Sequence, residues 1–488
     1  MELIVIIVYG VLLMFILAYS LVQLSLARTY ARRFKSNQTL VIPEVLEAWP
    51  VVTIQLPVYN ELYVVERLID AVAAIDYPAD KLEIQVLDDG NDDSVELAIN
   101  RVAYWKSKGI NIEHIQRPDR VGYKAGALAC GLEVAKGEFT AIFDADFIPD
   151  PLFLRKTIPF LMADPSIGVV QTKWEHVNED YSMLTRMQAF GLDAHFSVEQ
   201  VGRNENGHFI NFNGTAGVWR NACIADAGGW QHDTITEDLD LSYRAQLNGW
   251  KFKYLEEVGS PSELPAEMNG LKSQQFRWTK GAAECAVKNL GKVIRKKGLP
   301  FSTKLHAIFH LMNSFVFLCI LGAAILSLPI LWVKINRPVY DMLFKLAAIF
   351  LIGFLILAYF YWMSRKHKHE SVLKFMGYFP LFLSVSMGLS LHNSIAVIEG
   401  YVGKKTPFVR TPKYALTAKT GTWTGKRYAA LKANPLTIVE LLLMVYFIFG
   451  MALGISNSEY GLLPFHLMLA FGFGYVAFMS IKHSRGVQ

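Results

Sequence analysis

The chain has 488 residues, 52% of them apolar, and a net charge of +5 from 48 basic and 43 acidic side chains. Its apolar content and positive mean hydropathy exceed those of an ordinary soluble enzyme, so part of the chain should lie in a membrane. Basic residues cluster beside apolar runs, which indicates membrane topology and argues against a nucleic acid partner. The four cysteines show no paired metal spacing, which argues against a zinc site or a disulfide framework: Cys130, Cys223, Cys285 and Cys319.

The first apolar run, Leu3 to Ala27, is long enough to span a bilayer and is followed by the basic segment RTYARRFK, without a small-residue cleavage site. We predict a retained anchor over residues 1–35. Its C-terminal end should be cytosolic, because cytoplasmic flanks collect lysine and arginine. Residues 36–270 are then expected to form a cytosolic domain, and residues 271–304 to form interfacial helices.

Further apolar runs cover residues 305–333, 342–363, 375–402, 436–455 and 462–481. The run 375–402 contains Pro380, Asn393 and Glu399, and basic segments that should be cytosolic lie on both of its sides, so we predict an interfacial or re-entrant segment there. The other four runs and the anchor predict about five transmembrane helices. Residues 305–488 would form the membrane region, with a cytosolic loop over 403–434. Alternatively, some of these runs are core helices of a soluble protein.

Strand-like and helical runs alternate from residue 51 to residue 146, beginning with VVTIQLPV and ELYVVERLIDAVAAI. This alternation predicts a parallel sheet covered by helices, with ligands at the carboxyl ends of its strands. Three polar clusters follow strands and should converge there: PVYNE at 57–61, DDGNDD at 88–93 and DAD at 144–146. Taken alone, DDGNDD also fits a turn that caps a helix.

The pair Asp144 and Asp146 follows an apolar, β-branched strand. Strand alternation would send both side chains to one side, where two carboxylates repel each other unless a cation lies between them or one stays protonated. A hard divalent ion resolves this, and Mg²⁺ and Mn²⁺ use one or two carboxylates together with substrate phosphate oxygens. We therefore predict a metal site for a phosphorylated ligand.

The first strand is not followed by a Gly-rich phosphate loop, which argues against a P-loop nucleotidase or a dinucleotide oxidoreductase. Side chains must then help to hold the phosphates. The segment RPDRVGYKAGAL supplies Arg117, Arg120 and Lys124, the last at the start of a predicted helix, where anions are favoured. A solvated basic face is the alternative interpretation of this segment.

Three further motifs complete an ordered set: FNGTAGVWR at 212–220, TEDLDLSYRAQLNGWKF at 236–252 and QQFRWTKG at 274–281. With DDG and DAD, the set resembles the processive inverting glycosyltransferases of family 2, which include cellulose, hyaluronan, chitin and mannan synthases. The likeness is closest to plant cellulose-synthase-like A (mannan) and C (glucan) enzymes and covers most of residues 50–285. It implies a GT-A (Rossmann-like) α/β domain inserted into an α-helical transmembrane bundle.

The resemblance implies a role for each motif on the donor side. Asp88 and Asp89 would contact the nucleobase and ribose, and Asp144 and Asp146 would hold the metal and the donor sugar, with Asp146 the direct ligand. Gln274 and Arg277 would help Lys124 to hold the diphosphate, since a guanidinium binds phosphate through two hydrogen bonds.

On the acceptor side, the resemblance makes Asp238 the base that accepts the hydroxyl proton, oriented by Glu237. TED also reads as a helix cap. Trp278 would form the floor of the acceptor site, because an indole offers a flat apolar face to a sugar, although an interfacial aromatic residue is the plainer interpretation. Phe212, Gly214 and Thr215 resemble the F-x-G-T motif at the acceptor end.

The segment FVRTPK at 408–413 resembles the gating loop of cellulose synthase, F-x-V-T-x-K, and supplies Phe408, Thr411 and Lys413. Arg410 replaces the usual valine, which leaves insertion of the loop over the donor open. The chain ends soon after its last apolar run, so activation by a cyclic dinucleotide through this chain is not expected.

These features predict a membrane-embedded inverting β-glycosyltransferase that polymerises hexoses and passes the polysaccharide through its own helices. GDP-mannose or UDP-glucose would be the donor, Mg²⁺ or Mn²⁺ the cofactor, and membrane lipids the surroundings. One alternative is a single-transfer enzyme that glycosylates a lipid such as ceramide. Another is a transporter with a nucleotide-regulated domain, although paired hydrophobic halves are not evident.

Overall fold

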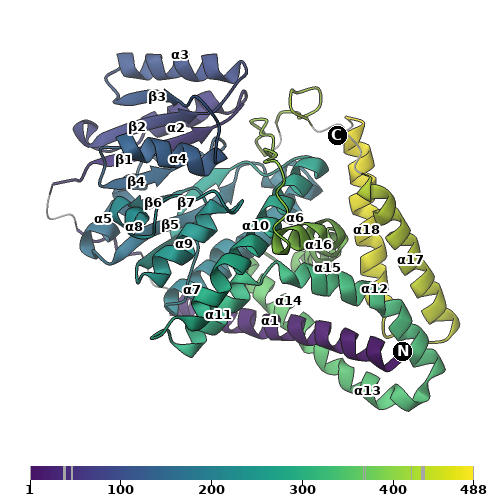
Figure 1. Ribbon diagram of the computed structural model, residues 1–488. Coiled ribbons are helices and arrows are strands. Elements are labelled where there is room, and N and C mark those ends of the chain that lie inside the picture. The colour runs from purple at the N-terminus through teal and green to yellow at the C-terminus, as the bar shows by residue number, and fades with distance from the viewer. Residues whose placement is uncertain are drawn as a thin grey trace.

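The computed structural model describes residues 2–36, 40–44, 48–366, 368, 370–418, 420–429 and 435–486. Figure 1 shows a strand-rich part on the left, long apolar helices on the right and helix α10 between them. The last residues of the predicted cytosolic loop, 430–434, lie outside the described residues.

A seven-stranded sheet forms the centre of the strand-rich part, in the order β3-β2-β1-β4-β6-β5-β7. Its strands are β1 (Val52–Val58), β2 (Leu82–Asp88), β3 (Ile112–Gln116), β4 (Phe139–Ile142), β5 (Ile167–His176), β6 (Gly217–Arg220) and β7 (Lys251–Ser262). Strands β1 to β4 are parallel, as the alternation predicts, with Val52 opposite both Leu82 and Phe139. Beyond these four strands the sheet is mixed, because β6 runs antiparallel to both β4 and β5.

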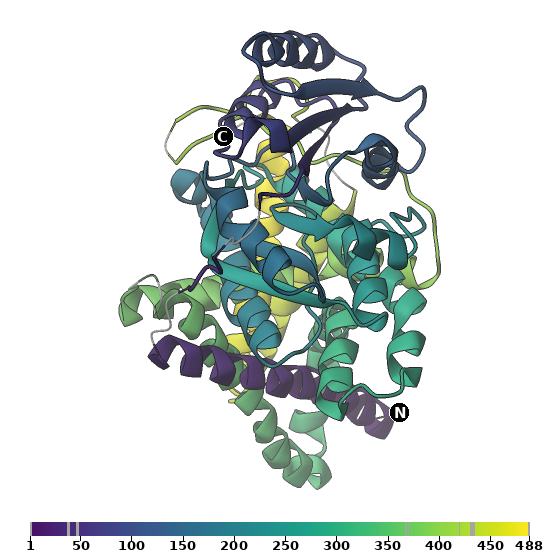
Figure 2. The ribbon, with the colours of Figure 1, turned by 90° about the vertical axis from the view of Figure 1, so that its left-hand side faces the viewer.

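Helices cover both faces of the sheet, as Figure 2 shows from its side. The covering helices are α2 (Val65–Ala73), α3 (Ser94–Ser107), α4 (Tyr123–Val134), α5 (Phe153–Ala163), α7 (Gln200–Glu205), α8 (Asn221–Asp226) and α9 (Glu237–Leu247). Helix α6 (Met183–Ala194) packs mainly against apolar helices. The apolar residues on one face of α2, among them Leu68, Ile69 and Val72, are buried against the strands. Burial of apolar area from both layers is what holds the sheet and helices together.

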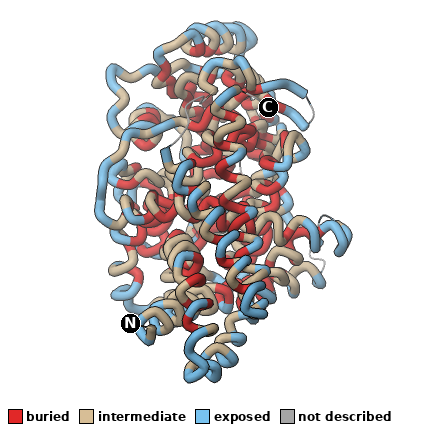
Figure 3. The backbone as a smooth tube through the Cα atoms, turned by 90° about the vertical axis from the view of Figure 1, so that its right-hand side faces the viewer, coloured by how far each residue is buried: buried red, intermediate tan, exposed pale blue. Residues whose placement is uncertain are grey.

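The apolar helices are α1 (Glu2–Ser36), α12 (Phe315–Asn336), α13 (Asp341–Leu346), α14 (Leu351–Lys366), α15 (Val372–Gly388), α16 (Ser390–Tyr401), α17 (Leu436–Ser456) and α18 (Leu463–Ser484). Among the described residues, five helical segments are long and apolar enough to cross a membrane, or six if the bent pair α15–α16 is one span. Apolar side chains such as Leu3, Val11 and Ile438 are exposed on them. Figure 3 shows buried residues concentrated in the middle of the molecule and exposed residues around its edge.

Two of the predicted apolar runs are broken. Residues 305–333 form α11 (Phe301–Leu311) and α12, with a turn between them. The run 375–402 bends by 49° between α15 and α16. At this bend a Cβ on Gly388 would lie 2.3 Å from the carbonyl oxygen of Gly472, so the close approach of α18 requires glycine there.

Helix α10 (Met268–Arg295) joins the two parts as one continuous helix of 28 residues. Its Lys272 is buried and donates to Glu440 on α17 at 2.7 Å and to Ser480 on α18 at 2.9 Å. A buried charge of this kind needs its partner, so the pair fixes α10 against the last two helices.

Candidate active site

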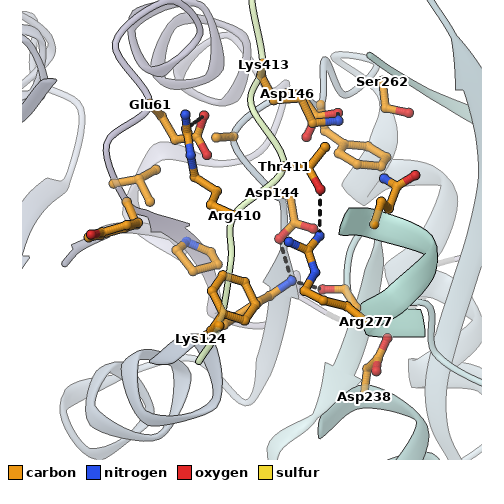
Figure 4. Close-up of a pocket in the computed structure, with 18 of the residues that line it drawn as sticks. Glu61, Lys124, Asp144, Asp146, Asp238, Ser262, Arg277, Arg410, Thr411 and Lys413 are labelled. Carbon is orange, nitrogen blue, oxygen red and sulfur yellow. Dashed lines mark hydrogen bonds and ion pairs between the residues drawn. The ribbon is translucent and has the colours of Figure 1, made fainter. Parts of the chain in front are cut away.

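A cleft of about 230 Å³ lies at the carboxyl ends of β1, β2 and β4, bounded by the start of α9 and by α10. Figure 4 shows Asp144, Asp146, Asp238 and Arg277 around it, with Lys124 on one side and Lys413 on the other. The three polar clusters that follow β1, β2 and β4 thus converge, as the sequence predicts, because parallel strands end at one edge of the sheet.

Asp144 and Asp146 lie just beyond β4, which ends at Ile142, so strand alternation does not set their directions. Asp144 accepts a hydrogen bond from the ammonium of Lys124, and Asp146 accepts one from Lys413 at 2.7 Å and from the backbone N–H of Glu263 at 3.0 Å. Each carboxylate is therefore neutralised by a lysine of its own.

The carboxylates of Asp144 and Asp146 provide only part of the ligands that a divalent cation needs. The described residues contain no group of three metal-ligating His, Cys, Asp or Glu side chains. The Asp144 side chain is 34% exposed to the cleft, however, and Mg²⁺ and Mn²⁺ commonly take one or two protein carboxylates and complete their coordination with water and phosphate oxygens. Asp144 and Asp146 can supply the protein share of such a site.

The two aspartates of the DDG motif occupy different positions. Asp89 lines the cleft and is bound by both Nε and Nη2 of Arg117, at 2.9 and 2.5 Å. Asp88 is buried behind it, where it accepts from the backbone N–H of Gly90 at 2.7 Å and lies 3.0 Å from Nε2 of His114. Asp89 can contact a ligand directly, whereas Asp88 shapes the turn that follows β2.

Arg120 lies over the ring of Tyr59, with 3.2 Å between the guanidinium carbon and the ring centroid. Both residues line the cleft. A guanidinium stacked on an aromatic ring is a flat, positively charged surface, suited to an anion or a planar ring. Arg120 is thus part of the cleft and not of a solvated basic face.

Glu237 and Asp238 begin α9 and line the cleft. The Thr236 side chain makes no capping hydrogen bond, so TED does not act as a capping box here. Burial, together with the negative charge of Glu237, raises the pKa of Asp238 to about 7. A carboxyl group with such a pKa can exchange a proton near neutral pH.

Gln274, Arg277 and Trp278 reach the cleft from α10. Gln274 and Trp278 also line a second cavity of about 430 Å³ among the apolar helices, which includes Tyr19 of α1 and Phe317 of α12. Trp278 lies 6.5 Å from Trp174, another cleft residue, centroid to centroid. The indole of Trp278 therefore stands where the cleft meets the cavity.

The F-x-G-T motif lies only partly at the cleft. Phe212 is fully buried in the core, and Thr215 is buried where its hydroxyl accepts from the backbone N–H of Asp144 at 2.9 Å. Gly214 lines the cleft at φ 80°, and a Cβ on it would lie 3.0 Å from Oδ2 of Asp238. Asn213, which the motif leaves unspecified, lines the cleft beside it.

Residues 408–416, which we call the strap, line the cleft through Phe408, Arg410, Thr411 and Lys413, so replacement of the usual valine does not keep the segment out. Arg277 donates to the carbonyl oxygen of Val409 and to the Thr411 hydroxyl, the latter at 2.9 Å. The Phe408 ring stacks on Tyr123, with 5.3 Å between centroids. Phe408 and Thr411 are thus brought to Arg277, and Lys413 to Asp146.

Arg410 secures the strap through an ion pair with Glu61 at 2.6 Å. Burial raises the pKa of Glu61, and the opposing effect of the Arg410 guanidinium is smaller, so the pKa is about 7. The sequence marks PVYNE as a polar cluster but indicates no partner for Glu61. Sequence reasoning also misses Glu263, whose carboxylate accepts from the backbone N–H groups of Tyr414 and Leu416 at 2.8 and 3.2 Å.

Arg410→Ala is expected to release the strap, because it removes the Glu61 partner and leaves a buried carboxylate unpaired. Backbone amides of residues 408–416 should exchange with deuterium about 5 to 30 times faster, corresponding to roughly 1–2 kcal/mol. Arg427→Ala is a matched control, since Arg427 pairs with Asp93 at 2.8 Å on the exposed side. Native exchange in Arg410→Ala would contradict a securing role for this ion pair.

Comparison with known proteins places the chain in a family. Residues 50–281 match the family described as glycosyltransferase-like family 2. Glucomannan 4-beta-mannosyltransferase 2 of Arabidopsis thaliana is 42% identical over 309 residues, covering 61% of this chain and 57% of that protein. Glucomannan 4-beta-mannosyltransferase 7 of the same plant is 34% identical over 453 residues, covering 88% of this chain and 77% of that protein.

A solved structure shares the fold. It is a mannosyltransferase from Pyrobaculum calidifontis in complex with GDP-Man and Mn²⁺, with a TM-score of 0.56 and 19% identity, covering 82% of this chain and 100% of that one. At this identity the likeness shows a shared GT-A-like fold with a mixed sheet and nothing beyond the fold. From the extent of its match to the second plant enzyme, the chain belongs to glycosyltransferase family 2, in the cellulose synthase-like group.

Proposed function

We propose that the protein is an inverting β-mannosyltransferase or glucosyltransferase that lengthens a polysaccharide of the mannan or glucan type from a nucleotide-sugar donor. The observation that carries the proposal is the cleft itself, which unites two acidic side chains beyond β4, the carboxyl group of Asp238 and the indole of Trp278. The relatives named glucomannan 4-beta-mannosyltransferases favour a mannosyl donor, for which we propose GDP-mannose. Because several of these matches span just over half of the relatives' length, the activity of the whole protein is part of the proposal.

In this proposal, Asp144 and Asp146 hold Mg²⁺ or Mn²⁺, which would neutralise the donor diphosphate and make it a better leaving group. Lys124 and Arg277 surround the same place and would bind the phosphate oxygens. Asp89, Arg120 and Tyr59 would receive the nucleoside at the end of β2.

Asp238 would accept the proton of the acceptor hydroxyl as its oxygen attacks the anomeric carbon, while the nucleoside diphosphate leaves from the opposite face. Glu237 would keep the proton affinity of Asp238 high through its neighbouring negative charge. Trp278 would stack against the terminal sugar of the acceptor.

We further propose that the product is a polymer that leaves through the apolar helices. The cavity that shares Gln274 and Trp278 with the cleft supports this route, since a chain stacked on Trp278 would extend into it. The strand-rich part would then be cytosolic, with the basic residues that follow α1 on the same side. A single-transfer lipid glycosyltransferase is not favoured by the plant relatives.

The test uses the purified full-length protein with GDP-mannose or UDP-glucose and with Mg²⁺ or Mn²⁺. The product is sized by mass spectrometry and digested with linkage-specific glycosidases. A digestible β-linked polymer is expected. A lipid that bears one sugar, or a lack of transfer with all the donors, would overturn the proposal.

Trp278→Ala is expected to shorten or abolish the polymer while slow hydrolysis of the donor continues, because loss of the aromatic face costs about 1–3 kcal/mol of acceptor binding. Product length is the measurement. Trp332→Ala is a control, since Trp332 is exposed on α12, away from the cleft. Full-length product from Trp278→Ala would contradict its role as the acceptor floor.

A further inference from the structure

A line of hydrogen bonds connects α1 with the cleft. Gln23 of α1 donates to Oε1 of Glu199 at 2.5 Å. The other oxygen of Glu199 lies 2.7 Å from Nδ1 of His195, and Nε2 of His195 lies 3.2 Å from Oδ1 of Asn213. Asn213 lines the cleft, whereas His195 and Glu199 do not. Any influence of His195 and Glu199, which we call the pair, on a ligand must therefore pass through Asn213.

The pair is formed by an unusual piece of backbone. Residues His195–Glu199 make a single π-helical turn between α6 and α7. Such turns are rare and often occur at functional sites. A carboxylate oxygen of Glu199 also lies 3.8 Å from the guanidinium of the buried Arg203. Burial alone would raise the pKa of Glu199, but Arg203 and His195 outweigh this effect and lower the pKa to about 2. Glu199 is thus a fixed negative charge that orients the imidazole ring.

In the side-chain amide of Asn213, the oxygen Oδ1 has hydrogen-bond partners and the nitrogen Nδ2 has none among the described residues. Its Oδ1 receives Nδ2 of Asn211 at 2.6 Å in addition to His195, and its backbone N–H donates to Oε1 of Gln171 at 3.0 Å. Its Nδ2 is buried and has no hydrogen-bond partner among the described residues. A buried polar group without a partner is costly, so an unused group on a cleft-lining side chain indicates a ligand contact.

The location of this group relates it to the acceptor. Asn213 directly precedes Gly214, where an added Cβ would lie only 3.0 Å from Oδ2 of Asp238. A sugar whose hydroxyl lay at Asp238 would therefore lie beside the segment that carries Asn213. Lys124 and Arg277, the side chains proposed to bind the donor diphosphate, form their hydrogen bonds with other residues and not with His195 or Glu199.

We propose that His195 and Glu199 are positioning residues that hold the Asn213 amide against a hydroxyl of the acceptor sugar, beside Asp238. The proposal rests on the proposed glycosyltransferase function and adds to it a residue that selects the acceptor. The competing possibility is that the line of hydrogen bonds only fastens α1 to the strand-rich part.

The experiment measures two quantities on the purified full-length protein: the binding constant of the donor, and the KM of a short β-1,4-linked manno-oligosaccharide as acceptor. His195→Ala and Asn213→Ala are each expected to raise the acceptor KM about 10- to 100-fold, as for loss of a hydrogen bond in a desolvated site, with donor binding within about 2-fold of native. The double variant should be no worse than Asn213→Ala, because both changes remove the same contact.

His208→Ala is the matched control. His208 also joins neighbouring helices, with Nδ1 3.1 Å from the Thr303 hydroxyl and its ring stacked on His306, but it does not line the cleft. Its acceptor KM should stay native. If His195→Ala does not fold, His195→Gln takes its place with the same expected result, since one amide cannot reach Glu199 and Asn213 together.

Each outcome decides between the possibilities. A native acceptor KM in the His195 variant, additive effects in the double variant, or an equal loss in His208→Ala would overturn the positioning role. A parallel loss of donor binding would assign the pair to fastening α1. If the native protein itself transfers no sugar to the acceptor, the proposed function fails first, and the positioning role falls with it.

Discussion

Asp238→Asn is expected to slow sugar transfer by about two to four orders of magnitude while donor binding stays close to native. The amide has the shape of the carboxyl group but cannot accept the proton of the acceptor hydroxyl. Single-turnover transfer and donor titration, measured on the same preparation, separate the two effects. Asp233→Asn is the control, because Asp233 lies in the loop that leads into α9 but pairs with Lys288 at 2.6 Å on the exposed side.

The pH dependence of the native enzyme gives a second measure of this role. Because burial and Glu237 raise the pKa of Asp238 to about 7, its carboxyl group is protonated below that pH and cannot act as a base. The transfer rate should therefore rise as the pH rises through about 7, and the residual rate of Asp238→Asn should lose this rise. Equal losses of donor binding and transfer in Asp238→Asn would instead make the residue structural.

Asp146→Asn is expected to abolish detectable transfer. The change removes a charged oxygen from the proposed cation and leaves the donor diphosphate poorly neutralised. It also removes the charge that Lys413 of the strap contacts at 2.7 Å, so the strap should loosen. The measurements are donor turnover over a range of Mg²⁺ or Mn²⁺ concentrations and hydrogen exchange of residues 408–416.

Asp150→Asn is the matched control for this change, since Asp150 lies in the segment that follows Asp146 and pairs with Lys156 at 2.8 Å, outside the cleft. It should keep both turnover and metal dependence. Near-normal turnover of the native protein after removal of divalent metal would contradict the metal site, while leaving the role of Asp238 untouched.

Much of the strand-rich part follows from local sequence. The alternation of apolar strands with amphipathic helices predicts β1 to β4 and α2 to α4 within a few residues, because side-chain periodicity is a local property. Sequence motifs also identified four residues of the cleft, because the motifs occur in the same order and at similar spacing as in family 2 glycosyltransferases: Asp89, Asp144, Asp238 and Trp278. The antiparallel β6 could not be predicted in this way, because the direction in which a strand joins a sheet depends on distant partners.

The sequence by itself determined which chemical groups the cleft can hold: a pair of carboxylates after β4, a carboxyl group at the start of α9, and a guanidinium and an indole side by side in the sequence of α10. Only the tertiary structure decided their partners. Lys413 meets Asp146 across 267 residues, and Arg410 meets Glu61 across a still longer stretch of chain, contacts without any local signal. The structure also buried Phe212 in the core and left Asn213 at the cleft, since burial and charge pairing depend on all the segments that meet at one place, and not on the segment that carries the residue.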